Sequence, residues 1–140
     1  MVRQSDLALR PARVLAVDDD RYITRLLEFI LTKHGYKVAT ANCAEKALAM
    51  IDEFQPDSIL LDLGLPGMSG IEAIRLLRQD HKYARLPIMV LSARSFEHIP
   101  DELKDAGATD LWAKPIAPST LLSRLKDFGI PPDVEDRPNK

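Results

Sequence analysis

The sequence predicts an α/β fold in which a doubly wound, five-stranded parallel sheet is covered by five helices. Short apolar runs alternate along the chain with segments whose apolar residues recur at helical spacing. This alternation is typical of a parallel sheet with helices on both faces. The apolar runs are nearly continuous, as expected for strands that are buried on both sides. A length of 140 residues suits one domain that needs neither disulfides nor a structural metal to fold.

The predicted strands are short and hydrophobic. They lie at residues 14–17, 36–40, 58–61, 88–91 and 111–113. The run at 36–40 alternates weakly between apolar and polar residues, which is typical of an edge strand. The runs at 14–17, 58–61 and 88–91 are apolar almost throughout, so we expect both of their faces to be buried.

The predicted helices follow these strands in alternation. Their segments are 23–31, 44–51, 71–77, 100–106 and 121–128. Asn42 is a suitable N-cap for the second helix, and Pro100 is expected in the first turn of the fourth. Gly35 and Gly129 are expected to end the first and the last helix.

The two ends of the chain show neither pattern. Residues 1–12 are predicted to form a loose N-terminal segment. Residues 130–140 hold three prolines among charged residues, which predicts a Pro-rich tail or the start of a linker. The predicted domain therefore spans residues 13–129.

Composition and charge exclude several function classes. The net charge of −2 comes from 19 basic and 21 acidic residues, so direct binding of nucleic acid is not expected. The single cysteine, Cys43, rules out an intramolecular disulfide and a zinc site of paired cysteines. No apolar run approaches the ~20 residues that span a bilayer, and we find no secretory signal at the N-terminus. We therefore expect a cytoplasmic protein with no membrane partner.

Polar side chains follow four of the predicted strands at their carboxyl ends. Asp18 to Asp20 follow the first strand, Asp62 the third, Ser92 the fourth and Lys114 the fifth. Taken alone, each has an ordinary interpretation as a helix cap, a turn former or a surface charge. In a parallel sheet, however, all four positions meet at one edge, where ligands of such folds bind. Their convergence is therefore the strongest functional signal in the sequence.

Carboxylates gathered at one sheet edge repel one another, so a compensating cation is expected. Mg²⁺ suits a site with few protein ligands and retained waters, and the ammonium group of Lys114 is a second candidate. Together they would leave a positive spot beside Asp62 that suits a phosphoryl group. A carboxylate is an adequate nucleophile for phosphorus and gives an aspartyl phosphate. Ser92 would donate a hydrogen bond to a phosphoryl oxygen.

At these residues the sequence resembles the receiver domain of two-component response regulators. The resemblance covers about residues 13–128. It is carried by the stretches 14–20, 56–70, 87–93 and 106–110 and by Lys114-Pro115. It implies a flavodoxin-like strand order of 2-1-3-4-5.

The resemblance also implies a metal site for Mg²⁺. Asp19 would bind the ion directly, and Asp18 would act partly through water. Asp62 would supply a further carboxylate oxygen. Gly64 occupies the position where the family uses a backbone carbonyl as a metal ligand, a role that any residue can fill.

In the same resemblance, Asp62 is the phosphoacceptor, Ser92 is the hydroxyl of the switch, and Lys114 is the invariant lysine with a cis peptide to Pro115. The domain would catalyse its own phosphorylation and dephosphorylation rather than turn over a small substrate. The phosphodonor would be a phosphohistidine on a histidine kinase or a phosphotransfer protein. A downstream protein target or output domain would read the changed surface, and a phosphorylation-dependent dimer is a further expectation.

One departure from the family pattern leaves an alternative open. The family commonly has Tyr or Phe three residues before the lysine, where this chain has Leu111 beside Trp112. Trp112 is expected in the core, and Arg94 on the solvated surface. Leu111 motivates the alternative of a receiver-like protein-binding module that acts independently of phosphorylation. An aspartyl-phosphate phosphatase fits less well, because such hydrolases place a second Asp where this chain has Gly64.

Overall fold

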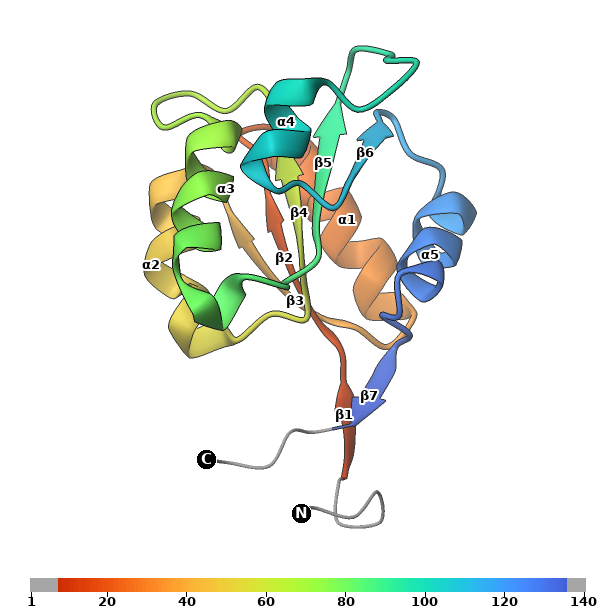
Figure 1. Ribbon diagram of the computed structural model, residues 1–140. Coiled ribbons are helices and arrows are strands. Elements are labelled where there is room, and N and C mark those ends of the chain that lie inside the picture. The colour runs from red at the N-terminus through yellow and green to blue at the C-terminus, as the bar shows by residue number, and fades with distance from the viewer. Residues whose placement is uncertain (1–7, 136–140) are drawn as a thin grey trace.

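The computed structural model describes residues 8–135 and contains the predicted parallel sheet (Figure 1). Its strands are β2 (Arg13–Val17), β3 (Lys37–Ala41), β4 (Ser58–Asp62), β5 (Ile88–Ser92) and β6 (Asp110–Ala113). They pair in parallel in the order β3-β2-β4-β5-β6. Counted within the sheet, this is the order 2-1-3-4-5, so the predicted fold class is confirmed.

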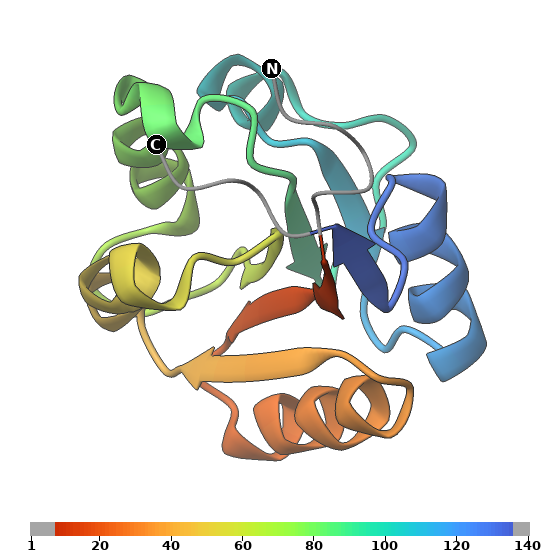
Figure 2. The same cartoon turned by 90° about the horizontal axis from the view of Figure 1, so that it is seen from below.

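The helices cover both faces of the sheet (Figures 1 and 2). They are α1 (Arg21–Lys33), α2 (Ala44–Phe54), α3 (Gly70–Gln79), α4 (Asp101–Ala106) and α5 (Pro118–Asp127), with a short 3-10 helix at His81–Tyr83. Residues of α1 and α5 pack in one hydrophobic cluster, and residues of α2, α3 and α4 pack in the other. None of the helices within residues 8–135 is both long and apolar enough to cross a membrane.

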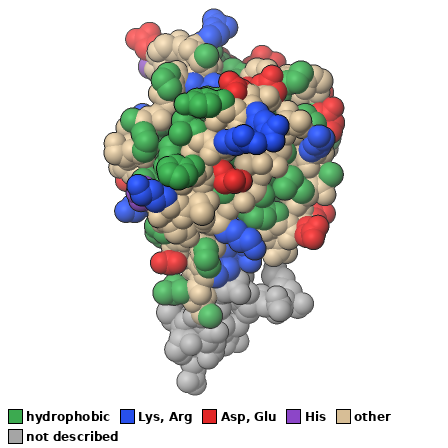
Figure 3. Space-filling view, turned by 180° about the vertical axis from the view of Figure 1, so that it is seen from behind, with side chains coloured by type: hydrophobic (Ala, Val, Ile, Leu, Met, Phe, Trp, Pro, Cys, Tyr) green, Lys and Arg blue, Asp and Glu red, His purple; other side chains and the backbone are tan. Residues whose placement is uncertain are grey.

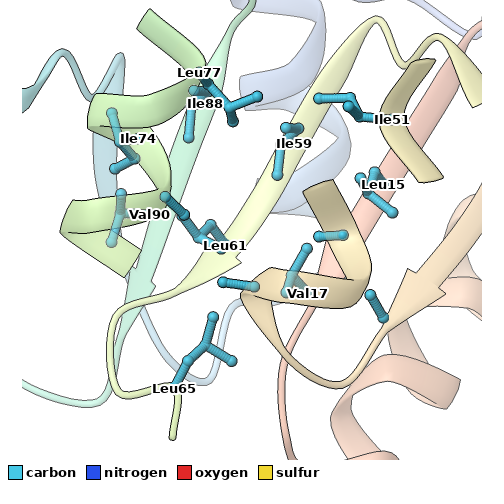
Figure 4. Packing of buried hydrophobic residues seen from close by; sticks show 14 of the residues in the cluster. Leu15, Val17, Ile51, Ile59, Leu61, Leu65, Ile74, Leu77, Ile88 and Val90 are labelled. Atoms are coloured by element: carbon cyan, nitrogen blue, oxygen red, sulfur yellow. The ribbon is translucent and has the colours of Figure 1, made fainter. Parts of the chain in front are cut away.

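Strand pleating divides the core between the two faces. In β2, Leu15 and Val17 belong to the cluster under α2 and α3, whereas Val14 and Ala16 belong to the cluster under α1 and α5. Figure 4 shows the first cluster, in which side chains from β2, β4 and β5 point toward the helices above them. All five residues of β4 and of β5 are buried, which explains why these runs are apolar almost throughout.

The helix caps follow the predictions only in part. Asp20 caps α1, and its Oδ1 accepts a hydrogen bond from Tyr22 N at 2.9 Å. Asn42 does not cap α2: Ala44 is the first helical residue, so the extended position before it falls on Cys43, whose side chain makes no capping hydrogen bond. Pro100 likewise lies before α4 rather than in its first turn, because its ψ of 141° is extended.

A second, two-stranded sheet lies at the amino-end rim of the main sheet (Figure 2). Here β1 (Leu9–Pro11) pairs antiparallel with β7 (Asp133–Glu135). Both strands lie in segments that the sequence pattern predicts to be loose. The difference arises because contacts between residues far apart in the sequence hold these strands, and local periodicity cannot reveal such contacts. The expectations for residues 1–7 and 136–140 lie outside the described residues.

Candidate functional site

The carboxyl ends of the central strands bring the predicted polar residues to one edge of the sheet (Figure 1). Asp18 follows β2, Asp62 ends β4, Ser92 ends β5 and Lys114 follows β6. The strands are in register at this edge, since Asp62 pairs with Leu91 and Ser92 with Ala113. Four positions that are distant in the sequence are thus placed on neighbouring strand ends.

Lys114 joins two buried carboxylates. Its Nζ donates hydrogen bonds to Oδ1 of Asp62 at 3.0 Å and to Oδ2 of Asp18 at 3.2 Å. Asp18 and Asp62 are only 2% and 6% exposed. The second oxygen of Asp18 accepts a hydrogen bond from Asp20 N at 2.9 Å. Asp20 therefore holds Asp18 through its backbone while its side chain caps α1.

The acidic side chains are arranged so that they could hold a metal ion. Asp18, Asp19 and Asp62 each offer a carboxylate oxygen, and these three atoms lie within 4.8 Å of one another. Asp19 is exposed, so the group opens to solvent on one side. Oxygen ligands with room for retained waters fit Mg²⁺ better than a softer transition metal. The side chains present therefore suit a Mg²⁺ site.

The charges of this group act on one another. Burial raises the pKa of the Asp18 carboxyl, and the nearby negative charge of Asp62 raises it further, while Asp20 N–H and Lys114 oppose this shift. Burial by itself would lower the pKa of Lys114. Its hydrogen bonds with Asp62 and Asp18 outweigh that effect, so the pKa is raised and the ammonium form is stabilised. A fixed positive charge thus stands between two carboxylates.

The remaining predicted site residues, Ser92 and Gly64, lie on the strand end and the turn next to the contacts of Lys114 with the two aspartates. Ser92 is buried, and its Oγ accepts a hydrogen bond from Arg94 N at 3.1 Å. The backbone of Lys114 donates to Ser92 O at 2.7 Å, and the peptide bond from Lys114 to Pro115 is cis. Gly64 lies in the exposed turn after β4, with no atom within 4 Å of the position that a Cβ would take.

Leu111 and Arg94 line a surface hollow, whereas Trp112 lies in the core. Trp112 is fully buried, as predicted, and its Nε1 donates to Asp110 Oδ2 at 2.8 Å. Leu111 is half-buried and lines a hollow of about 930 Å³ between the loop at 94–99, α4 and β6. Arg94 is exposed, and its guanidinium group lies 5.1 Å from the centre of the Phe96 ring. No local pattern in the sequence signals this hollow.

Most of the chain matches a known protein family. Residues 14–126 match the response regulator receiver domain. The transcriptional regulatory protein KdpE of Mycobacterium tuberculosis is 42% identical over 113 residues. The phosphate regulon transcriptional regulatory protein PhoB of Pseudomonas aeruginosa is 38% identical over 113 residues. Each match covers 81% of this chain and 49% of the relative, so the chain spans about half the length of these curated relatives.

Solved structures give the same result. The chemotaxis response regulator CheY4 of Vibrio cholerae superposes with a TM-score of 0.79 and is 35% identical. The superposition covers 84% of this chain and 98% of CheY4. The part of the chain outside the superposition is therefore additional to that compact domain.

Proposed function

The chain belongs to the response regulator receiver domain family, and on that premise we propose that it accepts a phosphoryl group on Asp62 in the presence of Mg²⁺. The observation that supports this most directly is the Lys114 amine, which holds both Asp62 and Asp18 within 3.2 Å in a buried setting. A cation at this distance from the acceptor oxygen is suited to binding the oxygens of an incoming phosphoryl group.

In the proposed reaction, a carboxylate oxygen of Asp62 forms a bond to phosphorus while the bond from phosphorus to the donor's imidazole nitrogen breaks. The electron pair stays on that nitrogen, which takes up a proton. Lys114 and Ser92 bind the transferred oxygens and so offset the charge that gathers on them. Asp18, Asp19, Asp62 and the carbonyl of Gly64 would hold Mg²⁺, which supplies further charge neutralisation when bound. The same groups would serve hydrolysis of the aspartyl phosphate.

The proposed phosphodonor is a phosphohistidine on a histidine kinase or a phosphotransfer protein. A protein donor must contact the surface around Asp62, and α1 offers a suitable surface there. Tyr22, Leu26 and Phe29 lie at helical spacing on its outer side and are 72%, 42% and 66% exposed. Figure 3 shows hydrophobic side chains exposed among charged ones on the side of the molecule opposite to that of Figure 1. This apolar stripe begins two residues after Asp20 and therefore starts close to the acidic residues at the end of β2. Its position supports docking of a protein rather than of a small molecule alone.

Phosphorylation would change a partner-binding surface through Ser92. Its Oγ accepts from Arg94 N, and Arg94 begins the loop that borders the hollow beside Leu111. A hydroxyl drawn toward a phosphoryl oxygen would alter this contact and with it the loop. A downstream protein or an output domain is the proposed reader, and dimerisation on phosphorylation is a further possibility of the same surface. A phosphorylation-independent module would have no use for two buried carboxylates around a lysine, so we do not favour it.

The proposal is tested with acetyl phosphate and Mg²⁺. Intact-mass spectrometry of the wild-type chain should show an added phosphoryl group that is absent in Asp62→Asn and when Mg²⁺ is removed by EDTA. Asp127→Asn, which neutralises an exposed aspartate in α5, is the matched control and should be phosphorylated like the wild type. Equal labelling of Asp62→Asn and wild type would refute the proposal.

The docking surface is tested separately. Phe29→Ser should leave phosphorylation by acetyl phosphate unchanged and slow transfer from the autophosphorylated histidine kinase that is most active in a panel of such kinases. Transfer at the wild-type rate would exclude α1 as the docking surface.

A further inference from the structure

The ribbon of β1 and β7 lies outside residues 14–126, the part of the chain that matches the family. It also lies at the opposite end of the sheet from Asp62 (Figures 1 and 2). Its function is therefore not explained by the phosphoacceptor site. The two strands of the ribbon contact different parts of the domain.

On one side, β1 is fixed to the beginnings of two central strands. The Arg10 guanidinium donates two hydrogen bonds to Asp57, at 2.8 and 2.9 Å. Asp57 directly precedes β4, and its Oδ2 also accepts from the backbone N of Arg13 at 2.7 Å. The side chains of Arg10 and Asp57 are only 15% and 18% exposed. A bidentate pair in a partly buried setting is stronger and more directional than an exposed ion pair.

On the other side, the segment that leads from α5 to β7 is fixed to the same rim. Ile130 is 3% exposed, and its carbonyl accepts a hydrogen bond from the Tyr36 hydroxyl at 2.6 Å. Pro132 O accepts from Ala12 N at 2.7 Å, and Ala12 O accepts from Lys37 N at 2.8 Å. The chain after α5 is thus joined to β2 and β3 by a continuous series of hydrogen bonds.

Helix α5 contributes a narrow apolar stripe to the core. Its buried residues are Leu121 and Leu125 alone, a narrow stripe for a helix of 10 residues. At its C-terminal end, Phe128 packs against Trp112 with ring centres 6.2 Å apart. Ile130 N donates to Leu125 O at 2.8 Å, which joins the end of the helix directly to the segment held by Tyr36.

We propose that β1, β7 and the Arg10–Asp57 pair form a terminal strap that fastens the C-terminal end of α5 to the amino-end rim of the sheet. The folded structure then extends beyond the family boundaries at residues 14 and 126, and the strap is a local contact that opens separately from the rest of the domain. The strap leaves the edge with Asp62 free and restrains the helix that follows Lys114.

Hydrogen exchange followed by mass spectrometry tests the strap. In the wild type, the amides of Ile130, of residues 133–135 and of Ala12 should be protected. Arg10→Met keeps the aliphatic stem but removes the donors, and should speed exchange in residues 118–135 about tenfold or more, with much less effect in α1. Trp112 fluorescence should change as well, because Phe128 and Arg124 contact the indole ring. Phosphorylation by acetyl phosphate should be unchanged.

Lys82→Met is the matched control, since it breaks an exposed ion pair with Asp52 elsewhere on the surface. It should leave exchange in α5 at the wild-type rate. Unprotected amides at Ile130 and at residues 133–135 in the wild type would show that the strap does not form, even if Arg10→Met failed to fold. Equal acceleration in α1 and α5 would show that Arg10 stabilises the whole domain rather than the end of α5. Either result would overturn the proposal.

Discussion

Nζ of Lys114 lies 3.0 Å from Oδ1 of Asp62, although the two residues are 52 positions apart in the sequence. The same nitrogen lies 3.2 Å from Asp18. One ammonium group therefore compensates two carboxylates that are almost inaccessible to solvent. Removing one partner of such a group leaves buried charge without compensation, which is costly both to the fold and to charge development during a reaction.

Lys114→Met should therefore slow phosphorylation in addition to lowering the stability of the fold. Loss of one group that stabilises developing charge typically costs about 100-fold to 1,000-fold in rate. We expect phosphorylation by acetyl phosphate to fall by about this factor in a stopped time course measured by intact mass. Binding of Mg²⁺ should be retained, because the carboxylates remain and a competing positive charge is gone. Lys126→Met, which removes an exposed lysine of α5, should keep the wild-type rate. A Lys114→Met chain that is phosphorylated normally would contradict the role given to this amine.

The fold was predictable because its signals are local. Apolar runs of three or four residues define all the strands but the alternating one at 36–40, and parallel pairing then brings the ends of β2, β4, β5 and β6 to one edge without further information. The meeting of Asp18, Asp62 and Lys114 follows from this topology, while their chemical roles stay predictions. Contacts between distant residues that the parallel topology does not itself bring together were not predictable. The sequence around Arg10 and Asp57 contains nothing that reveals their pairing, so the terminal strap appears only in three dimensions.

The contacts of Arg78 were not predictable from the sequence either. In the sequence it is one of several charged residues on the polar side of α3. In the structure its guanidinium donates to Gly107 O at 2.8 and 3.0 Å and to Tyr83 O at 2.6 Å. It joins the end of α3 to the end of α4. Burial lowers the pKa of Arg78. A Cβ at residue 107 would lie 2.8 Å from Arg78 Cγ, and the φ of +107° at that residue also favours glycine.

Arg78→Met should lower the free energy of unfolding by about 2–4 kcal/mol, because several charged hydrogen bonds are lost and partly buried carbonyls are left without their donor. Urea denaturation followed by circular dichroism measures this. Arg75→Met removes an exposed arginine from the same helix and should change the free energy of unfolding by less than about 0.5 kcal/mol. Equal stability of the two variants would show that the Arg78 contacts contribute little.

Tyr36 makes the stability of the domain depend on alkaline pH. Burial raises the pKa of its hydroxyl to about 12, whereas a tyrosine in an unfolded chain ionises near pH 10. The neutral form is therefore favoured by folding. Its stabilisation is complete below about pH 10 and is lost as the pH rises toward 12, because the unfolded chain releases its proton first. Burial and the hydrogen bond to Asp52 also raise the pKa of Tyr83, so Tyr36 accounts for only part of this loss.

Tyr36→Phe should be less stable than the wild type at pH 8 by about 1 kcal/mol, since Ile130 O loses its donor. Between pH 10 and 11.5 the free energy of unfolding of Tyr36→Phe should fall less steeply with pH than that of the wild type. The two slopes should differ by up to about 1.4 kcal/mol per pH unit. Urea denaturation at a series of pH values gives both quantities. Tyr22→Phe, which removes an exposed hydroxyl, should follow the wild-type curve. Parallel curves for Tyr36→Phe and wild type would contradict the assignment of the alkaline loss to this hydroxyl.

Ser58 offers the opposite case, a buried polar group that we expect to weaken the fold. It begins β4 beside Val14, is fully buried, and its Oγ has no protein hydrogen-bond partner among residues 8–135. A buried hydroxyl without a partner costs about 1–3 kcal/mol relative to solvent. Ser58→Ala removes only this oxygen and should raise the free energy of unfolding by about 1 kcal/mol in urea denaturation. Ser95→Ala, at an exposed loop position, should have no measurable effect. A loss of stability in Ser58→Ala would mean that the hydroxyl is satisfied in solution and that the start of β4 depends on it.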